Sequence, residues 1–310
     1  MKTVEISIIA PVFNEEVVVE EFYNRVVNVL SKISTSFEII FIDDGSTDKT
    51  LYKIKKLSER DSSIKAISFS RNFGHSMAIS AGLDNAQGEA VIILDGDLQD
   101  PPEILPEFIN KWKEGYDVVY GIRTRRKEWF GKRLTYWLFY RILKKLSNLK
   151  IPVDAGDFCL MDKAVVESIR SLPERNRFIR GLRSWVGFKQ YGLVYERSSR
   201  FAGVTKYPLG KLIKLATDAI FSFSDIPLKI ATWLGFIIAG GSFIAILAVL
   251  YAKVFWGALP PRGFASTVIV ILFLGGVQLI SIGVLGEYVA RIYEEVKHRP
   301  LYIIREKIGL

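Results

Sequence analysis

The sequence predicts an α/β protein with a parallel, doubly wound sheet in its N-terminal part and two transmembrane helices near its C-terminus. The sheet is predicted by short apolar runs that alternate with helical segments between residues 5 and 121. Such alternation is typical of parallel strands covered by helices on both faces. Two long uncharged stretches near the C-terminus predict the membrane helices.

The strands and helices follow one another in order. Apolar runs predict strands at 6–12, 37–42, 64–69, 90–94 and 117–120. Helical spacing of apolar residues predicts helices from about 16 to 30, 46 to 60, 75 to 86, 103 to 113 and 162 to 171. Polar clusters separate these segments, and they follow the strands rather than precede them.

Composition narrows the class of protein. The chain has 310 residues, a net charge of +9 and 49% hydrophobic residues. A large core is therefore possible, and the surface should attract anions such as nucleotides or acidic lipids. With two His and one Cys, Cys159, His-rich zinc chemistry is disfavoured and an intrachain disulfide is impossible. Glu5 stands where a signal peptide would be apolar, so we expect none.

The two uncharged stretches, 230–252 and 264–286, are each longer than the roughly 20 residues that span a bilayer core. Glycines in both stretches suit close helix packing and favour a homo-oligomer. Lys and Arg flank the pair, at Lys206, Lys211, Lys214 and Lys229 before it and at Arg291, Lys297, Arg299, Arg305 and Lys307 after it. The loop between them holds only Lys253 and Arg262. We therefore expect a multi-pass protein of the cell membrane with both termini and the sheet domain in the cytoplasm.

Asp95 and Asp97 directly follow the fourth apolar run. In an extended backbone, residues two apart project to the same side, and ligands of open α/β sheets bind beyond the carboxyl ends of the strands. Mg2+ and Mn2+ prefer oxygen ligands, and Mg2+ is typically held by one or two carboxylates together with substrate phosphates. The alternative for an isolated Asp-x-Asp is a polar turn between a strand and a helix.

Other polar residues follow the neighbouring strands, namely Glu15, Asp43, Asp44 and Arg71. We expect all of them to converge with the Asp pair on one edge of the sheet. No Gly-x-Gly-x-x-Gly follows the first strand and no Walker loop is present. The dinucleotide-dehydrogenase and P-loop interpretations are therefore disfavoured.

Four motifs occur in a characteristic order: Pro11-Val-Phe-Asn-Glu15, Asp43-Asp-Gly-Ser-x-Asp48, Ser70-Arg-Asn-Phe-Gly74 and Asp95-Gly-Asp-Leu-Gln-Asp-Pro101. In these motifs the chain resembles glycosyltransferase family 2 of the GT-A fold, over roughly residues 4 to 225. Within it, the chain resembles the polyprenyl-phosphate hexosyltransferases, which include bactoprenol glucosyltransferases and dolichyl-phosphate mannose synthases. The two-helix C-terminal part matches the bactoprenol branch.

The resemblance implies roles for individual residues. Those expected to bind the nucleotide are Pro11, Phe13, Glu15, Asp43, Asp44, Arg71 and Asp95. Asp95, Asp97 and Gln99 would bind the Mg2+ or Mn2+ ion that bridges the diphosphate, and Asp97 would be a catalytic residue. An ion at this point would neutralise charge on the departing nucleoside diphosphate.

The resemblance also implies an acceptor side. Asp157 matches the family's acceptor-side Asp, with Asp154 as the weaker candidate. We expect it to act either as a base or as an orienting group, since a phosphate monoester is mostly dianionic at neutral pH. Basic residues expected to bind the acceptor phosphate are Arg123, Arg200 and Lys206. The structural alternatives are a turn before helix 162–171 and a solvated basic loop.

Basic and aromatic residues are interleaved between 123 and 145. With two spans in the same chain, this pattern favours an interfacial membrane helix at about 127–147 and no nucleic-acid partner. We therefore expect a cytoplasmic GT-A catalytic domain at 1–200 and an acceptor loop with a juxtamembrane amphipathic helix at 201–228. The two spans would lie within 229–287, and 288–310 would be a cytoplasmic tail.

The expected reaction is inverting transfer of a hexose from a nucleoside-diphosphate sugar to a polyprenyl phosphate. The two-helix resemblance favours UDP-glucose and undecaprenyl phosphate. GDP-mannose or another UDP-sugar as donor stays open. A processive polysaccharide synthase would usually carry Gln-x-x-Arg-Trp and more spans, and the chain has neither. A non-enzymatic sugar-nucleotide-binding membrane protein would not need the metal residues together with Asp157.

Overall fold

The computed structural model describes residues 4–33, 36–124, 155–175, 177–196, 226–256 and 263–310. The expected interfacial helix, Asp154, Arg200 and Lys206 lie outside these residues. Contacts divide the chain into a sheet-containing unit, which includes Arg299–Leu310, and a unit formed by the long C-terminal helices. Each is described separately.

The described part of the first unit contains a sheet of eight strands in the order β7-β5-β6-β4-β1-β2-β3-β8. The strands are β1 (Ile6–Val12), β2 (Phe37–Asp43), β3 (Ile64–Phe69), β4 (Ala90–Ile93), β5 (Val118–Thr124), β6 (Ala155–Asp162), β7 (Gln190–Glu196) and β8 (Ile304–Ile308). β1 to β4 are parallel, which confirms the central part of the prediction. β6 and β8 pair antiparallel with their neighbours, so the sheet is mixed.

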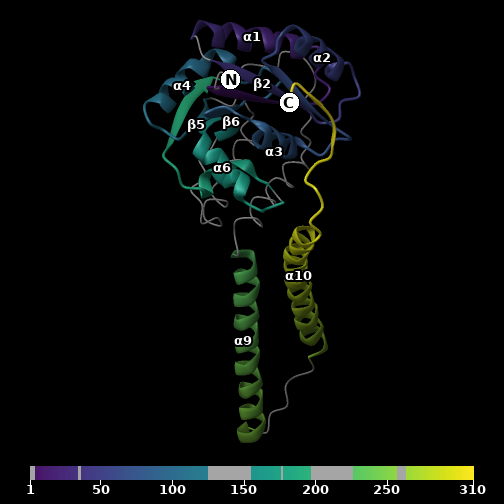
Figure 1. Ribbon diagram of the computed structural model, residues 1–310. Coiled ribbons are helices and arrows are strands. Elements are labelled where there is room, and N and C mark those ends of the chain that lie inside the picture. Colours follow the sequence, from purple (N-terminus) through teal and green to yellow (C-terminus); the bar gives the residue numbers. More distant parts are fainter. Residues whose placement is uncertain (1–3, 34–35, 125–154, 176, 197–225, 257–262) are drawn as a thin grey trace. The chain divides into compact units, whose positions relative to one another are not determined.

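Helices cover both faces of the sheet (Figure 1). One layer holds α1 (Val19–Lys32), α2 (Thr50–Arg60), the short η1 (Pro102–Ile104) and α4 (Leu105–Lys113). The other holds α3 (His75–Asn85), α6 (Lys163–Ser171) and α7 (Ile179–Trp185). Every residue of β1 is buried, which is why a strand covered on both faces appears in the sequence as a continuous apolar run.

Close packing fixes each layer against the sheet. In the first layer, the Phe22 ring of α1 meets the Phe41 ring of β2 edge-on, with centroids 5.7 Å apart. In the second, α3 approaches β1 so closely that a Cβ at Gly82 would lie 2.3 Å from the side chain of Ile9. The loops at the carboxyl ends of the parallel strands are thus carried by a rigid frame.

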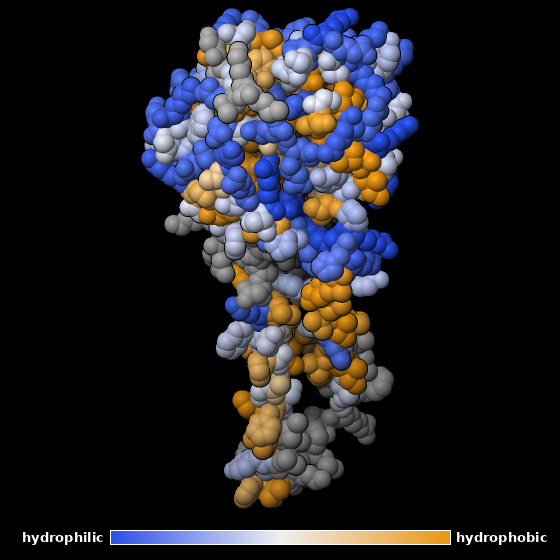
Figure 2. Space-filling model, viewed as in Figure 1, coloured by the Kyte–Doolittle hydropathy of each residue, from blue (hydrophilic) through white to orange (hydrophobic). Residues whose placement is uncertain are grey.

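The second unit consists of α9 (Ile226–Trp256) and α10 (Phe264–Val296), and the expected spans 230–252 and 264–286 lie within them. Each contains a window long and apolar enough to cross a membrane. Their large apolar side chains are exposed, for example Phe236 at 69% and Leu279 at 72%. Hydrophobic residues gather on the surface of the long helices (Figure 2). Apolar patches of this extent mark protein or membrane contact surfaces.

The last residues of the expected tail at 288–310 join the sheet. Residues 304–308 form β8, which pairs with β3 at the edge of the sheet. Ala66 is paired with Ile308 and Phe69 with Ile304. The segments before and after the long helices, β7 and β8, therefore belong to one sheet.

Candidate active site

The loops that follow β1 and β2 hold each other in place. The Asn14 amide oxygen accepts a hydrogen bond from the Thr47 backbone N–H at 2.8 Å, and the Asn14 N–H donates to the Ser46 hydroxyl at 2.9 Å. The Glu15 N–H donates to the Thr50 hydroxyl at 2.9 Å. Several polar residues of the first two motifs therefore build the loops, and the last of these bonds brings Glu15 to the start of α2.

Asp43 and Asp44 are buried at the end of β2, with 1% and 4% exposure. Asp43 accepts hydrogen bonds from the Ser46 N–H at 3.0 Å and the Ser68 hydroxyl at 2.8 Å. Asp44 accepts from the Phe73 N–H at 2.7 Å and from the Gly74 N–H at 3.0 Å. Burial raises the pKa of Asp44, and these two N–H donors oppose the rise. Both carboxylates thus hold the loops around the expected nucleotide site.

We call residues 70–74, between β3 and α3, the nucleotide loop, after the role that the resemblance implies for Arg71. It carries Arg71, an exposed side chain whose guanidinium lies 4.0 Å from the centroid of the Phe73 ring. The loop after β2 touches it at Gly45, which has φ +74° and whose added Cβ would lie 2.5 Å from the carbonyl carbon of Arg71. Only glycine fits both the conformation and this contact.

Asp95 and Asp97 extend from the carboxyl end of β4. A Cβ at Gly96 would lie 2.6 Å from the side chain of Val12, so the turn lies against the end of β1. Asp97 accepts a hydrogen bond from the Gln99 N–H at 3.1 Å, and Leu98 between them has φ +56°. Because Leu rarely adopts a positive φ, the surrounding structure must hold the backbone of this buried residue in a strained conformation.

Asp157 lies beside this turn because of the β4–β6 pairing. The antiparallel register places Ile93 opposite Cys159. Two residues past the end of β4, and two residues back along β6, the same register brings Asp95 next to Asp157. Arg180 of α7 donates two hydrogen bonds to the Asp157 carboxylate, at 2.8 and 2.7 Å. His75, the first residue of α3, lies with Nε2 3.4 Å from Asp95 Oδ1 and 3.7 Å from Asp157 Oδ2.

The charges of this group shift its pKa values strongly. Burial would raise the pKa of Asp157, but Arg180 and then His75 outweigh it and hold that pKa well below its usual range. Burial opposes the charged form of His75, but Asp95 and Asp157 together raise the pKa of His75 to about 9. At neutral pH, Asp157 is therefore an anion between two cationic side chains.

The acidic residues at this edge fit a divalent cation. Asp95 Oδ1 is buried and accepts no hydrogen bond of good geometry; its cationic neighbour is His75 Nε2, at 3.4 Å. Burial, followed by the charges of Asp100, Asp157 and Asp97, raises the pKa of Asp95, while His75 lowers it. Among the described residues, no three His, Cys, Asp or Glu side chains form a full ligand set. A Mg2+ or Mn2+ ion at Asp95 and Asp97 would complete its coordination with other oxygens, as is usual at diphosphate sites.

Arg123 lies on the other side of β6. Its guanidinium donates to the Tyr195 hydroxyl at 3.3 Å and to the Asp100 carboxylate at 3.4 Å, and the Tyr195 hydroxyl donates to Asp100 as well. Asp100 is fully buried. A Cβ at Gly156 would lie 2.7 Å from Arg123 Nη2. The structure thus places Arg123 against the backbone next to Asp157, with its charge matched by Asp100.

The structure gathers most of the sequence-predicted site residues on one edge of the sheet. Four residues of the site were missed: His75, Asp100, Arg180 and Tyr195. The sequence held a signal for two of them, since His75 directly follows the third motif and Asp100 lies within the fourth. Arg180 and Tyr195 lie far along the chain from the other residues, without a motif of their own.

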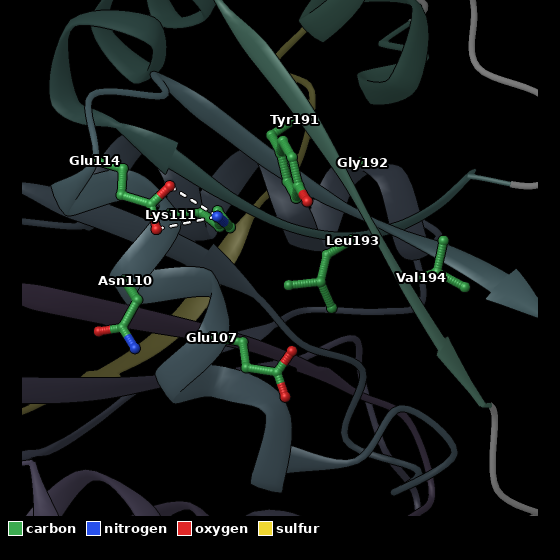
Figure 3. Close-up of a pocket in the computed structure, with 8 residues that line it drawn as sticks. All are labelled: Glu107, Asn110, Lys111, Glu114, Tyr191, Gly192, Leu193 and Val194. Atoms are coloured by element: carbon green, nitrogen blue, oxygen red, sulfur yellow. Dashed lines mark hydrogen bonds and ion pairs between the residues drawn. The ribbon is translucent and has the colours of Figure 1, made fainter.

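A surface hollow between α4 and β7 contains none of these residues (Figure 3). Its lining includes Tyr191 and Leu193 of β7 and an ion pair between Lys111 and Glu114 at 2.7 Å. No predicted site residue points into it. The site is therefore defined by the acidic edge of the sheet and not by this hollow.

Comparison with known proteins identifies the class of enzyme. Residues 7–170 match the family model described as glycosyl transferase family 2. This match covers more than half of the chain, so the protein belongs to glycosyltransferase family 2. It is a glycosyltransferase with a GT-A domain and two apolar C-terminal helices.

Similar proteins extend over the whole chain. The uncharacterized glycosyltransferase YkcC of Bacillus subtilis (strain 168) is 46% identical over 99% of this chain and 95% of its own length. The bactoprenol glucosyl transferase of Shigella phage SfV is 45% identical, over 98% of this chain and 99% of its own length. Among solved structures, mannosyl-3-phosphoglycerate synthase from Rubrobacter xylanophilus aligns with 70% of this chain and 72% of its own, at 16% identity and a TM-score of 0.49.

Proposed function

We propose that this enzyme transfers glucose from UDP-glucose to undecaprenyl phosphate at the cytoplasmic face of the membrane. The observation that carries the proposal is the similarity over nearly the whole chain to a protein named bactoprenol glucosyl transferase. That similarity includes both long helices as well as the catalytic domain. The two apolar helices support a lipid acceptor, and the acidic edge supports a donor that carries a diphosphate.

The reaction is a single displacement. An oxygen of the acceptor phosphate bonds to the anomeric carbon of the sugar while the bond from that carbon to the diphosphate breaks, and UDP leaves with the electron pair. One displacement inverts the anomeric configuration. Asp95, Asp97 and Gln99 would hold a Mg2+ or Mn2+ ion, which would neutralise charge on the leaving diphosphate as a Lewis acid. Pro11, Phe13 and Glu15, with the nucleotide loop, line the nucleoside.

Asp157 has an orienting role in this proposal. The acceptor phosphate is mostly dianionic at neutral pH and already carries its nucleophilic oxygen. An Asp whose pKa lies well below its usual range, paired with Arg180, is a weak proton acceptor. It instead holds Arg180 and His75, two cations, beside the position where the acceptor phosphate and the diphosphate meet. Arg123, Arg200 and Lys206 are proposed to bind the acceptor phosphate.

The sheet supports a hairpin arrangement of α9 and α10. β7 precedes the two helices and β8 follows them, and both strands belong to the same sheet. A sheet lies on one side of a membrane, so the chain between them crosses it an even number of times. The Lys and Arg residues that flank the helices favour the cytoplasmic side for the sheet.

The test uses purified full-length protein with undecaprenyl phosphate, Mn2+ and one radiolabelled donor at a time: UDP-glucose, GDP-mannose or another UDP-sugar. We expect label in the lipid extract with UDP-glucose and none in an Asp97→Ala control. Label from GDP-mannose alone would overturn the choice of donor. Label that remains in water-soluble polymer would indicate a processive synthase.

A further inference from the structure

The C-terminal strand extends the sheet as far as the nucleotide loop. β8 pairs antiparallel with β3, and the pairing reaches Phe69, the last residue of β3. One residue further, the Ser70 backbone N–H donates a hydrogen bond to the Ile303 carbonyl at 3.0 Å. The first residue of the nucleotide loop is therefore bonded directly to the C-terminal segment.

Tyr302 binds the elements on both sides of the nucleotide loop. Its ring stacks on Phe69 before the loop, with centroids 5.0 Å apart and an interplanar angle of 17°. Its hydroxyl donates a hydrogen bond at 2.9 Å to Asp84, near the end of the helix that follows the loop. Burial and the Asp84 charge raise the pKa of the Tyr302 hydroxyl, so it stays protonated and able to donate.

Ring contacts continue from Tyr302 to the cation in the loop. The Phe69 ring meets the Phe73 ring edge-on, with centroids 5.7 Å apart and an interplanar angle of 87°. The Arg71 guanidinium lies over the same Phe73 ring, and Asp44 accepts the Phe73 N–H. Without the Tyr302 ring, Phe69 would lose its stacking partner, and the contacts from Phe69 to Phe73 and Arg71 would be held less firmly.

We propose that Tyr302 and the Ile303 backbone position the nucleotide loop, so that this short segment after the long C-terminal helices forms part of the donor-binding site. Tyr302 is a positioning residue, since it acts on the donor through Phe69, Phe73 and Arg71. This rests on the proposed function, in which Arg71 faces a nucleoside diphosphate. It further implies that a chain ending before residue 302 binds the donor weakly even when its acceptor side is intact.

The test compares Tyr302→Ala with a control change in β8, the strand that begins two residues later. Glu306→Ala removes the ion pair with Lys55 of α2, at 2.7 Å, and leaves the nucleotide loop untouched. For each full-length variant, UDP affinity is measured by calorimetry with Mn2+, and KM is measured for the donor and for undecaprenyl phosphate. Thermal unfolding is recorded alongside.

Loss of an aromatic pair of this kind predicts that Tyr302→Ala weakens UDP binding and raises donor KM by about 3- to 10-fold. Acceptor KM should stay unchanged, and Glu306→Ala should match the wild type. Tyr302→Phe keeps the ring and loses the hydrogen bond to Asp84, so its donor KM should lie between those of the wild type and Tyr302→Ala. This variant also tests the proposal if Tyr302→Ala does not fold. Unchanged donor KM in both Tyr302 variants, or an equal rise in Glu306→Ala, overturns the proposal. Failure of the wild type to bind UDP would instead refute the proposed donor.

Discussion

Arg180 and Asp157 form a two-bond ion pair, with nitrogen–oxygen distances of 2.8 and 2.7 Å. Neither residue lies in the four N-terminal motifs: Asp157 is in β6 and Arg180 in α7, with α6 between these two elements. The pair leaves the Asp157 carboxylate charged and oriented before any substrate is bound. Its consequences for catalysis and for stability can be measured separately.

The pH dependence of an Asp157→Asn variant distinguishes an orienting group from a base. The pKa of Asp157 is depressed, so its ion pair persists above the ordinary carboxyl pKa and is lost only as pH falls through the lower folded value. We therefore expect the variant to lose kcat by a similar factor at about pH 6, where about half of a phosphate monoester is the monoanion, and at about pH 8.5, where nearly all of it is the dianion. A loss seen at the lower pH and recovered at the higher one would indicate a base for the phosphate monoanion.

Arg180→Ala leaves a largely buried carboxylate with one of its partners removed. We expect the free energy of unfolding to fall by about 1–3 kcal/mol, together with a drop in kcat. Arg180→Lys should recover little activity, because a single ammonium cannot make two parallel hydrogen bonds. Chemical denaturation and initial rates provide the two measurements. Full activity in Arg180→Lys would show that the charge matters and the geometry does not.

Removal of the divalent cation should abolish turnover and weaken UDP binding together. Asp95 Oδ1 is buried and accepts no hydrogen bond of good geometry, and a bound diphosphate would bring further negative charge to the same edge. We expect chelator to remove activity and Mn2+ to restore it in the wild type. In Asp97→Ala, Mn2+ should no longer strengthen UDP binding in calorimetry. Wild-type activity in excess chelator would refute the metal assignment.

Gly45→Ala tests the contact between the loops after β2 and β3. The residue has φ +74°, and the added methyl group would meet the Arg71 backbone. We expect a loss of about 1–3 kcal/mol in stability from the strained conformation, and a higher donor KM because the nucleotide loop must shift. Gly115→Ala is the matched control, with φ +89° and open space around its Cβ. It should cost stability and leave donor KM unchanged.

Labelling with a membrane-impermeant maleimide tests the hairpin. Cys159 is buried and should stay unlabelled. A cysteine introduced by Ala258→Cys, between the two helices, should react in intact cells. One introduced by Arg299→Cys, where the sheet unit resumes, should react only after the cells are opened. Reaction of both positions in intact cells would contradict the arrangement.

Much of the site could be predicted because it depends on local pattern. Asp44, Arg71 and Asp97 each follow an apolar strand, and the carboxyl ends of parallel strands meet at one edge. The partners of Asp157 could not be predicted in this way. β6 enters the sheet between β4 and β5, and only that register brings Asp157 to Asp95. His75 and Arg180 then reach the same carboxylate from two different helices.

The sequence by itself determined the strand–helix alternation, the acidic edge and the two apolar helices, because each depends on the type and spacing of residues that are close together in the chain. Tertiary structure alone decided that the sheet is mixed, that Arg180 neutralises Asp157 and that the last residues return to the sheet through Tyr302. These features join segments far apart in the chain. Their pairing depends on which sheet edges and helix faces the rest of the fold leaves open. The spacing of neighbouring residues in the sequence does not predict this.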